Sequence, residues 1–162
     1  MLYGPLMTGC KTVIWEGDPL YPDPFILWTI CEQNGVTNLY VNVSTLREIR
    51  KEDYEGMGFE EADLSALKTL CLVGERADPD TVNWLHEHLP DVIINDTYFC
   101  TELAWPIAAQ LCDLERYETV YPTLPGSVTR SSPGFEVRIL DDDGKEREQE
   151  DAPEGAPTST RT

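Results

Sequence analysis

Residues 96–102 combine hydroxyls, aromatic rings and two carboxylates, and they directly follow the apolar run 92–94. A strand that ends in such a segment delivers its polar groups to one edge of a sheet, and in open α/β sheets ligands bind at that edge. Glu102 beside the hydroxyl of Thr101 could hold Mg²⁺ together with a phosphate oxygen, because Mg²⁺ takes oxygen ligands and shares them with substrate phosphates. Turn chemistry, with Thr and Asp side chains bonding their own backbone, is the alternative interpretation.

Apolar patterns predict that strands and helices alternate upstream of this segment. Four runs have the composition of strands, namely residues 11–15, 36–41, 68–73 and 92–94. Helical spacing predicts helices that begin at Asp23-Pro24, at Ser44 and at Asp78-Pro79, with a short acidic helix over residues 60–66. Strands joined by helices at this spacing need crossover connections. We therefore expect an α/β fold with a partial doubly wound, mostly parallel sheet, covered by helices on both faces.

The C-terminal part of the sequence changes character. Residues 135–140 alternate apolar and polar side chains before Asp141-Asp142-Asp143-Gly144, which predicts a short antiparallel β-hairpin arm. Residues 145–162 are acidic, then rich in Pro, Thr and Ser, with almost nothing apolar. Such a segment cannot bury enough apolar surface to fold, so we expect a disordered tail.

The charge of the chain limits its partners. A net charge of −18 and an isoelectric point near 4.2 argue against nucleic acid or an anionic membrane as the main partner, so any phosphate must be held locally. Lysine occurs only at positions 11, 51, 68 and 145. Such an acidic surface fits adaptation to high salt and ordinary solubility equally well.

Cysteines and hydropathy point to a soluble protein of the cytoplasm. The five cysteines form no CxxC pair, and no secretory signal is recognisable, which favours a reducing compartment. The longest apolar runs fall far short of the roughly 20 residues that a membrane span requires. The four tryptophans fall mostly within periodic apolar patterns, so we expect them in the core, with Trp105 close enough to residues 96–102 to border a pocket.

The order of residues 96–102 carries a resemblance. Asp96-Thr97-Tyr98-Phe99, followed after one residue by Thr101-Glu102, resembles the Asp-Thr-Trp-Trp-Gln-Thr-Glu signature of acetyl- and propionyl-CoA synthetases. These are AMP-forming acyl-CoA synthetases of the adenylate-forming superfamily. Further similar segments occur in the family's order: Tyr3-Gly4-Pro5-Leu6 with Gly9, Thr12-Val13-Ile14 with Glu16-Gly17, Val73-Gly74-Glu75-Arg76, Pro125-Gly126-Ser127 with Pro133-Gly134, and Ile139-Leu140-Asp141. The resemblance thus assigns residues 1–144 to a partial AMP-binding domain and leaves 145–162 as the tail.

The resemblance implies an acyl-adenylate site. Gly74, Glu75 and Arg76 would line the adenine and ribose side. The same wall would continue through Asp96, Thr97 and Tyr98.

Two residues are implied as catalytic groups and two as the acyl pocket. Thr101 would contact the α-phosphate, and Glu102 the Mg²⁺ ion. Val73 and Phe99 would border the acyl group, and Phe in place of the family's Trp leaves a slightly larger pocket, so propionate is at least as plausible as acetate. Cys100 stands where the short-chain enzymes have Gln; a small packed side chain is its expected role, rather than a nucleophile.

The implied reaction uses ATP, Mg²⁺, CoA and a short-chain carboxylate. The carboxylate attacks the α-phosphate of ATP to give acyl-AMP and pyrophosphate, and the CoA thiol then displaces AMP. The family's Lys-containing phosphate loop, ribose-binding Asp, hinge and C-terminal domain with its catalytic Lys are not found in the sequence. A middle slice of the enzyme is therefore expected, one that needs complementing segments or self-associates.

Two other functions fit parts of the sequence. A non-catalytic remnant would at most bind nucleotide or a partner protein. A free-standing doubly wound nucleotide-binding module would need a Gly-rich strand-to-helix turn, and the sequence contains none.

Overall fold

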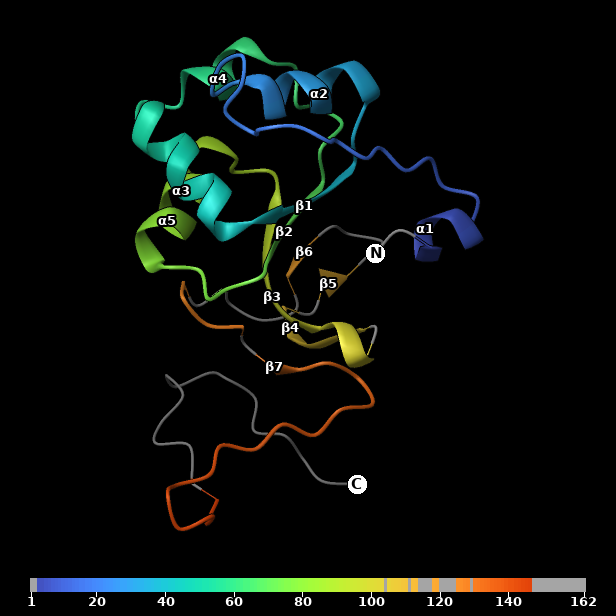
Figure 1. Cartoon of the computed structure of the whole chain (residues 1–162), viewed down its shortest axis with the longest axis vertical. Coiled ribbons are helices and arrows are strands. Elements are labelled where there is room, and N and C mark those ends of the chain that lie inside the picture. The colour runs from blue at the N-terminus through green and yellow to red at the C-terminus, as the bar shows by residue number, and fades with distance from the viewer. Residues whose placement is uncertain are drawn as a thin grey trace.

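The computed structural model describes residues 3–103, 105–110, 112–113, 118–119, 125–128 and 130–146. Its centre is a five-stranded sheet of order β1-β2-β3-β4-β7 (Figure 1). The strands are β1 (Asn38–Asn42), β2 (Thr69–Val73), β3 (Ile93–Cys100), β4 (Trp105–Ala109) and β7 (Arg130–Ser131). The first three are parallel, and β4 and β7 add antiparallel strands at the β3 edge. A separate two-stranded sheet contains β5 (Cys112–Asp113) and β6 (Glu118–Thr119).

The helices are α1 (Tyr3–Met7), α2 (Ile26–Asn34), α3 (Val43–Glu52), α4 (Met57–Glu61) and α5 (Pro79–His88), with a 3₁₀ turn, η1 (Thr101–Leu103), after β3. Of these, α3 and α4 connect β1 to β2 and α5 connects β2 to β3, as the alternating pattern predicts. Pro79 opens α5 after Asp78, whose side chain accepts a hydrogen bond from the Thr81 N–H, so the predicted cap is confirmed. Gly35 ends α2 in the left-handed conformation, with φ of 56°.

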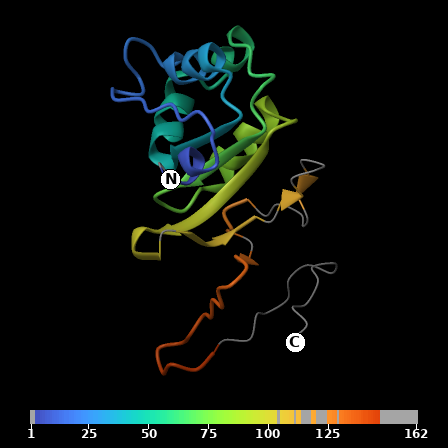
Figure 2. The same cartoon turned by 90° about the vertical axis from the view of Figure 1, so that its right-hand side faces the viewer.

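One hydrophobic core joins α2 to α5 with a single face of the parallel strands. Leu70, Leu72 and Ile94 point from the sheet into this core, and Trp28 of α2 and Trp84 of α5 close it. Strands in sequential order with right-handed crossovers place their connecting helices on the same face, and Figure 2 shows α2 and α3 gathered on one side of the strands.

The expectation of helices on both faces is therefore wrong for the part of the chain that the structure describes. On the other face Tyr40 is 46% exposed, and α1 contains no buried residue. A sheet whose strands follow one another in order sends every crossover to one side, so covering the second face requires strands added in the reverse direction.

Several predicted elements are shifted or absent. Residues 11–15 form no strand, and Ile14 and Trp15 are largely exposed. Ser44 lies inside α3, which begins at Val43, and the short acidic helix occupies Met57–Glu61 instead of 60–66. These short patterns lack the neighbours that would have fixed them, because a strand needs a partner strand and a cap needs the chain to turn at that residue.

The hairpin arm is reduced to its turn. Residues 135–139 are not a strand, and the only pairing there is an isolated bridge between Leu140 and Glu146 around the Asp141 turn. Lys145 and Glu146, assigned by sequence to the tail, thus close that turn. Residues 147–162 of the predicted tail lie outside the described residues.

No helix among the described residues is long and apolar enough to cross a membrane.

Candidate functional site

The carboxyl ends of β1, β2 and β3 meet at one edge of the sheet. The register pairs Asn42 with Val73 across β1 and β2, and Leu72 with Asp96 across β2 and β3. The Gly74-Glu75-Arg76 turn that leaves β2 therefore starts beside the middle of β3. In this way the fold brings together the turn and the residues Asp96, Thr97 and Tyr98, as the sequence predicted.

Residues 96–100 are strand, which corrects their expected placement in a loop. β2 ends at Val73, but β3 continues to Cys100 because β4 pairs with it on the other side, Thr97 opposite Ala109 and Cys100 opposite Trp105. The pairing shifts between Tyr98 and Phe99, which is a β-bulge. Bulges re-aim side chains next to functional sites.

The turn after β2 depends on a glycine. Gly74 has φ of 92°, and a Cβ at this position would lie 3.1 Å from the Asn42 side-chain oxygen. Glu75 and Arg76 are exposed, but each is held by a contact: Glu75 Oε2 accepts from Arg47 Nη1 at 2.8 Å, and Arg76 Nε donates to the Gly126 carbonyl at 3.0 Å. The second contact brings the Pro125-Gly126-Ser127 segment beside the turn.

Asp96 and Thr97 are buried at the centre of the edge. Thr97 Oγ1 donates to the Leu72 carbonyl at 2.7 Å and so ties β3 to β2. Neither carboxylate oxygen of Asp96 accepts a hydrogen bond of normal geometry from a described residue. Burial raises the pKa of this carboxyl, and the Ala77 N–H and the Arg76 charge offset the rise only in part. A buried carboxyl with unused acceptors is the kind of group that marks a ligand site.

Thr101 and Glu102 lie farther out, beyond the end of β3. At roughly 3.3 Å per residue, Thr101 is about 15 Å along the strand from Asp96. Both residues are exposed in η1, and Glu102 Oε2 accepts from the Cys100 thiol at 2.7 Å. The hydrogen bond from Cys100 lowers the pKa of Glu102. Thus Cys100 is half-buried and bonded to the predicted metal ligand.

The fit of Mg²⁺ rests on Glu102 alone. Among the described residues no three His, Cys, Asp or Glu side chains cluster as a metal site. Mg²⁺ is commonly held by one or two carboxylates with the remaining positions taken by substrate phosphates and water. An exposed carboxylate kept ionised beside the Thr101 hydroxyl fits that pattern.

Val73 and Phe99, the predicted acyl pocket, are both half-buried. Continuing the β2–β3 register by one residue places Val73 beside Thr97, two residues from Phe99 along the strand. Of the predicted core tryptophans, Trp28 and Trp84 are buried, but Trp15 and Trp105 are exposed. Trp105 pairs with Cys100 at the outer end of β3 and so lies close to the predicted site.

Sequence reasoning missed Arg47 and Asn42. Arg47 contacts the turn after β2 from α3, and Asn42, at the end of β1, occupies the space that a side chain at Gly74 would need. The only sequence signal for either is its position at or just after the end of a parallel strand, because the turn they contact lies about thirty residues downstream.

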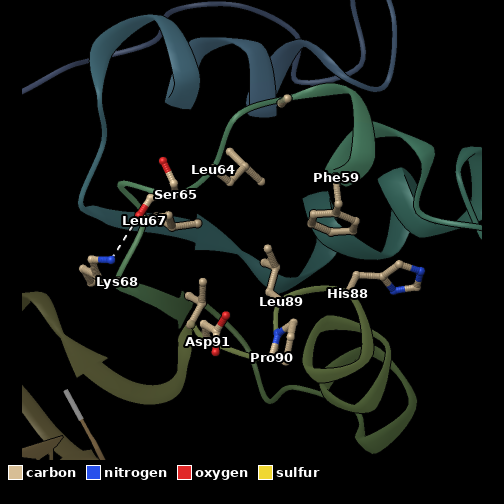
Figure 3. A pocket seen from close by; sticks show the side chains of 11 residues that line it. Phe59, Leu64, Ser65, Leu67, Lys68, His88, Leu89, Pro90 and Asp91 are labelled. Atoms are coloured by element: carbon tan, nitrogen blue, oxygen red, sulfur yellow. Dashed lines mark hydrogen bonds between the residues drawn. The ribbon is translucent and has the colours of Figure 1, made fainter. Parts of the chain in front are cut away.

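A hollow of about 360 Å³ lies at the opposite edge of the sheet, where the chain enters β2 and β3 (Figure 3). Phe59, Leu64 and Leu89 line it, and at its rim Lys68 Nζ donates to the Ser65 carbonyl at 3.0 Å. None of the predicted site residues borders this hollow.

Comparison with known proteins gives a consistent relationship. Residues 1–156 match the sequence model of the AMP-binding enzyme family. The chain is 37% identical over 148 residues to an acetyl-coenzyme A synthetase of Gemmatimonas aurantiaca, covering 90% of this chain and 21% of that protein. It is 33% identical over 142 residues to a propionate–CoA ligase of Escherichia coli, covering 88% of this chain and 22% of that protein.

A solved structure agrees in fold. Acetoacetyl-CoA synthetase from Streptomyces lividans superposes with a TM-score of 0.73 at 23% identity, over 90% of this chain and 22% of that one. The chain spans about a fifth of the length of the relatives that it matches. The match of the family model over residues 1–156 shows that this chain belongs to the AMP-binding enzyme family, within which it is similar to acyl-CoA synthetases.

Proposed function

We propose that this chain forms one wall of the acyl-adenylate site of an AMP-forming short-chain acyl-CoA synthetase, a ligase that joins acetate or propionate to CoA. The observation that carries the proposal is the register of β2 and β3. It sets the turn at Gly74 beside Asp96, Thr97 and Tyr98 of β3, and Thr101 and Glu102 follow in η1 directly after that strand. A nucleotide laid along that edge would meet these groups in succession.

Each part of the wall has a proposed role. The turn of Gly74, Glu75 and Arg76 borders adenine and ribose, together with Asp96, Thr97 and Tyr98. The buried Asp96 carboxyl, with its unused acceptors, supports this assignment. Thr101 contacts the α-phosphate.

Glu102 is the proposed Mg²⁺ ligand, and the ion would neutralise phosphate charge when bound. The chain's own contribution is positioning: Thr101 and Glu102 orient the α-phosphate for attack by a carboxylate, and the CoA thiol then displaces AMP. Val73 and Phe99 border the acyl group. The relatives include proteins named for acetate and for propionate, and both substrates are retained in the proposal.

The same proposal extends to partners and location. Residues 1–144 would act as a partial AMP-binding domain that binds small molecules, not nucleic acid or membrane. Complementing segments of the enzyme, or a second copy of this chain, would cover the open face of the sheet around Tyr40. The cysteines at positions 10, 31, 71 and 100 form no disulfide with one another, which supports a cytoplasmic location.

Carboxylate-dependent exchange of pyrophosphate into ATP tests whether this polypeptide is itself the enzyme. If it is, exchange should require acetate or propionate, and Glu102→Gln should abolish it. Folded chain without exchange would instead assign it to the alternative, a non-catalytic remnant that at most binds nucleotide or a partner.

A chimera separates the wall from the rest of the enzyme. Replacing the matching segment of the Escherichia coli propionate–CoA ligase with residues 1–144 should preserve propionate-dependent exchange. The same chimera with Thr101→Ala should lose most of it, about a hundredfold if Thr101 stabilises the reacting phosphate. A soluble chimera that is equally active with and without the substitution would contradict the role of Thr101.

A further inference from the structure

Arg47 reaches from α3 to the turn that follows β2. Its Nη1 donates to Glu75 Oε2 at 2.8 Å, its Nε to Asp78 Oδ2 at 2.7 Å, and its Nη2 to the Arg76 carbonyl at 3.2 Å. One guanidinium thus contacts three successive parts of the turn, a side chain, a backbone carbonyl and the helix cap. The planar fork of arginine suits such simultaneous contacts, whereas lysine offers a single point of charge.

Asp78 anchors this guanidinium to α5. The Asp78 carboxylate also accepts from the Thr81 N–H at 2.9 Å and from Thr81 Oγ1 at 3.0 Å. Arg50, one turn along α3, donates to Thr81 Oγ1 at 3.1 Å and lies 3.6 Å from Asp78 Oδ1. Arg50 therefore shares the anchor but makes no recorded contact with Glu75 or Arg76.

Ala77 is buried in the core, but residues 74–76 have few other restraints. Gly74 has no side chain and occupies the left-handed region, and Glu75 and Arg76 are exposed. Exposed loops with little buried surface are mobile unless specific contacts hold them. The Arg47 contacts and the bond from Arg76 to Gly126 supply that restraint.

Glu75 already has an ion-pair partner. Its carboxylate is paired with Arg47, so the side chain is directed toward α3. This assigns Glu75 a role through Arg47 instead of a direct contact to ribose.

We infer that Arg47 is a positioning residue for the proposed nucleotide site. It fixes the turn of residues 74–78 and holds Glu75 away from the ligand, so the affinity for nucleotide depends on Arg47 although Arg47 does not contact the nucleotide. The inference rests on the proposed function for its ligand. It goes beyond that function by naming a residue outside the site and by changing the role of Glu75.

The test combines two readouts on the full chain. Amide hydrogen exchange reports the turn without any ligand, and titration with AMP, followed by NMR, reports affinity. We expect Arg47→Met to speed exchange at residues 75–78 by about tenfold or more, with the amides of β1 to β3 unchanged. The AMP affinity of Arg47→Met should fall by about tenfold. The affinity of Arg47→Lys should lie between those of Arg47→Met and the wild type.

Arg50→Met is the matched control. It removes a positive charge that also lies beside Asp78 and comes from the same helix. Amide exchange in the turn and AMP affinity should both stay within about twofold of the wild type. The pair Arg47→Met/Glu75→Gln then tests the role of Glu75. If Glu75 acts only through Arg47, the double variant binds AMP as Arg47→Met does, within about twofold.

Each unexpected result contradicts a particular claim. Unchanged exchange in folded Arg47→Met, or equal loss of AMP affinity in Arg50→Met, overturns the inference. Losses that multiply in the double variant show that the Glu75 carboxylate contacts the ligand itself, which also overturns it. No AMP binding by the wild type overturns the proposed function of this chain, and the exchange arm still decides whether Arg47 fixes the turn.

Discussion

At the level of single residues, the Asp96 carboxyl is unfavourable for stability but is part of the proposed ligand site. Its carboxyl is buried at the end of the parallel strands, its oxygens have no partner of normal geometry among the described residues, and burial raises its pKa. An unsatisfied buried acceptor costs about 1–3 kcal/mol, so the Asp96 carboxyl lowers stability, and in the proposed function a ligand uses it.

We predict that Asp96→Asn stabilises the fold at neutral pH. Because the folded-state pKa lies above that of the unfolded chain, wild-type stability falls as pH rises above about 4, where the unfolded carboxyl ionises first. Asp96→Asn lacks that loss, so it should be more stable by about 1 kcal/mol at about pH 7, with the gain vanishing below about pH 4. Urea unfolding across this range measures it.

The same variant should bind AMP more weakly, in line with the proposed site. Asp91→Asn, an exposed carboxyl on the same approach to β3, is the control and should change neither quantity. A variant less stable than the wild type at every pH would show that Asp96 has a stabilising partner.

Among the helices and strands, α5 depends on its cap. Burial opposes the shift, but hydrogen bonds from Arg47 and from the Thr81 N–H lower the pKa of Asp78 to about 2. A depressed folded-state pKa stabilises the protein above the unfolded value of about 4, and this contribution is lost as pH falls toward about 2. The side chain is 36% exposed, so solvent and salt screen part of the effect.

Asp78→Ala should cost about 1–2 kcal/mol at neutral pH, the usual range for a helix cap with modest ionic help. The difference from the wild type should shrink as pH falls from about 4 to about 2, because the unfolded carboxyl protonates near 4 and the folded one only near 2. Asp80→Ala, exposed in the first turn of α5, is the control and should cost much less. Parallel stability curves for Asp78→Ala and the wild type down to about pH 2 would contradict the ionic contribution.

The tryptophans distinguish an element that builds the core from one that does not. Trp28 of α2 is fully buried and its ring lies 4.5 Å from Phe59, whereas Trp15 is 48% exposed outside any helix or strand. Trp28→Ala should destabilise the chain by about 3–5 kcal/mol, and Trp15→Ala by about 0.5 kcal/mol or less. Guanidinium unfolding measures both losses of stability. Equal losses would show that the segment of residues 11–15 is part of the cooperative core.

Across the whole molecule, charge is the dominant property. Thirty acidic residues against twelve basic ones leave a net charge of −18 on 162 residues. Repulsion among so many like charges opposes compaction, and salt screens it. Several exposed apolar side chains, Tyr40 on the edge strand β1 and Ile14 among them, add a tendency to associate once that repulsion is screened.

We predict that raising NaCl from about 0.1 M to about 2 M increases the thermal midpoint of the chain. Light scattering on the same samples should show association growing with salt as repulsion between copies is screened. Glycerol at matched osmolality controls for solvent exclusion and should give a smaller rise in midpoint. A midpoint that falls or stays constant with salt would favour ordinary solubility over high-salt adaptation as the meaning of the acidity.

Local signals predicted those features that need no distant partner. Asp78 and Pro79 start α5 because cap and ring geometry act within one turn, and Gly35 ends α2 because only the left-handed conformation closes it there. The parallel pairing of β1, β2 and β3 likewise follows from the alternation of strands with helices. Similar local signals predicted a helix start at Ser44 and a strand over residues 11–15, and both predictions were wrong. The helix begins at Val43, and residues 11–15 have no partner strand among the described residues.

The amino-acid sequence by itself determined the α/β class, the family and the side chains that β3 and the turn after β2 bring to the carboxyl edge of the sheet, because periodicity and motif order are local properties of the chain. Only the tertiary structure decided that residues 96–100 are strand, that one face of the parallel strands is uncovered by helices in the described part, and that Arg47 holds Glu75. Strand pairing and ion pairing join residues far apart in sequence, and their geometry exists only after the chain has folded.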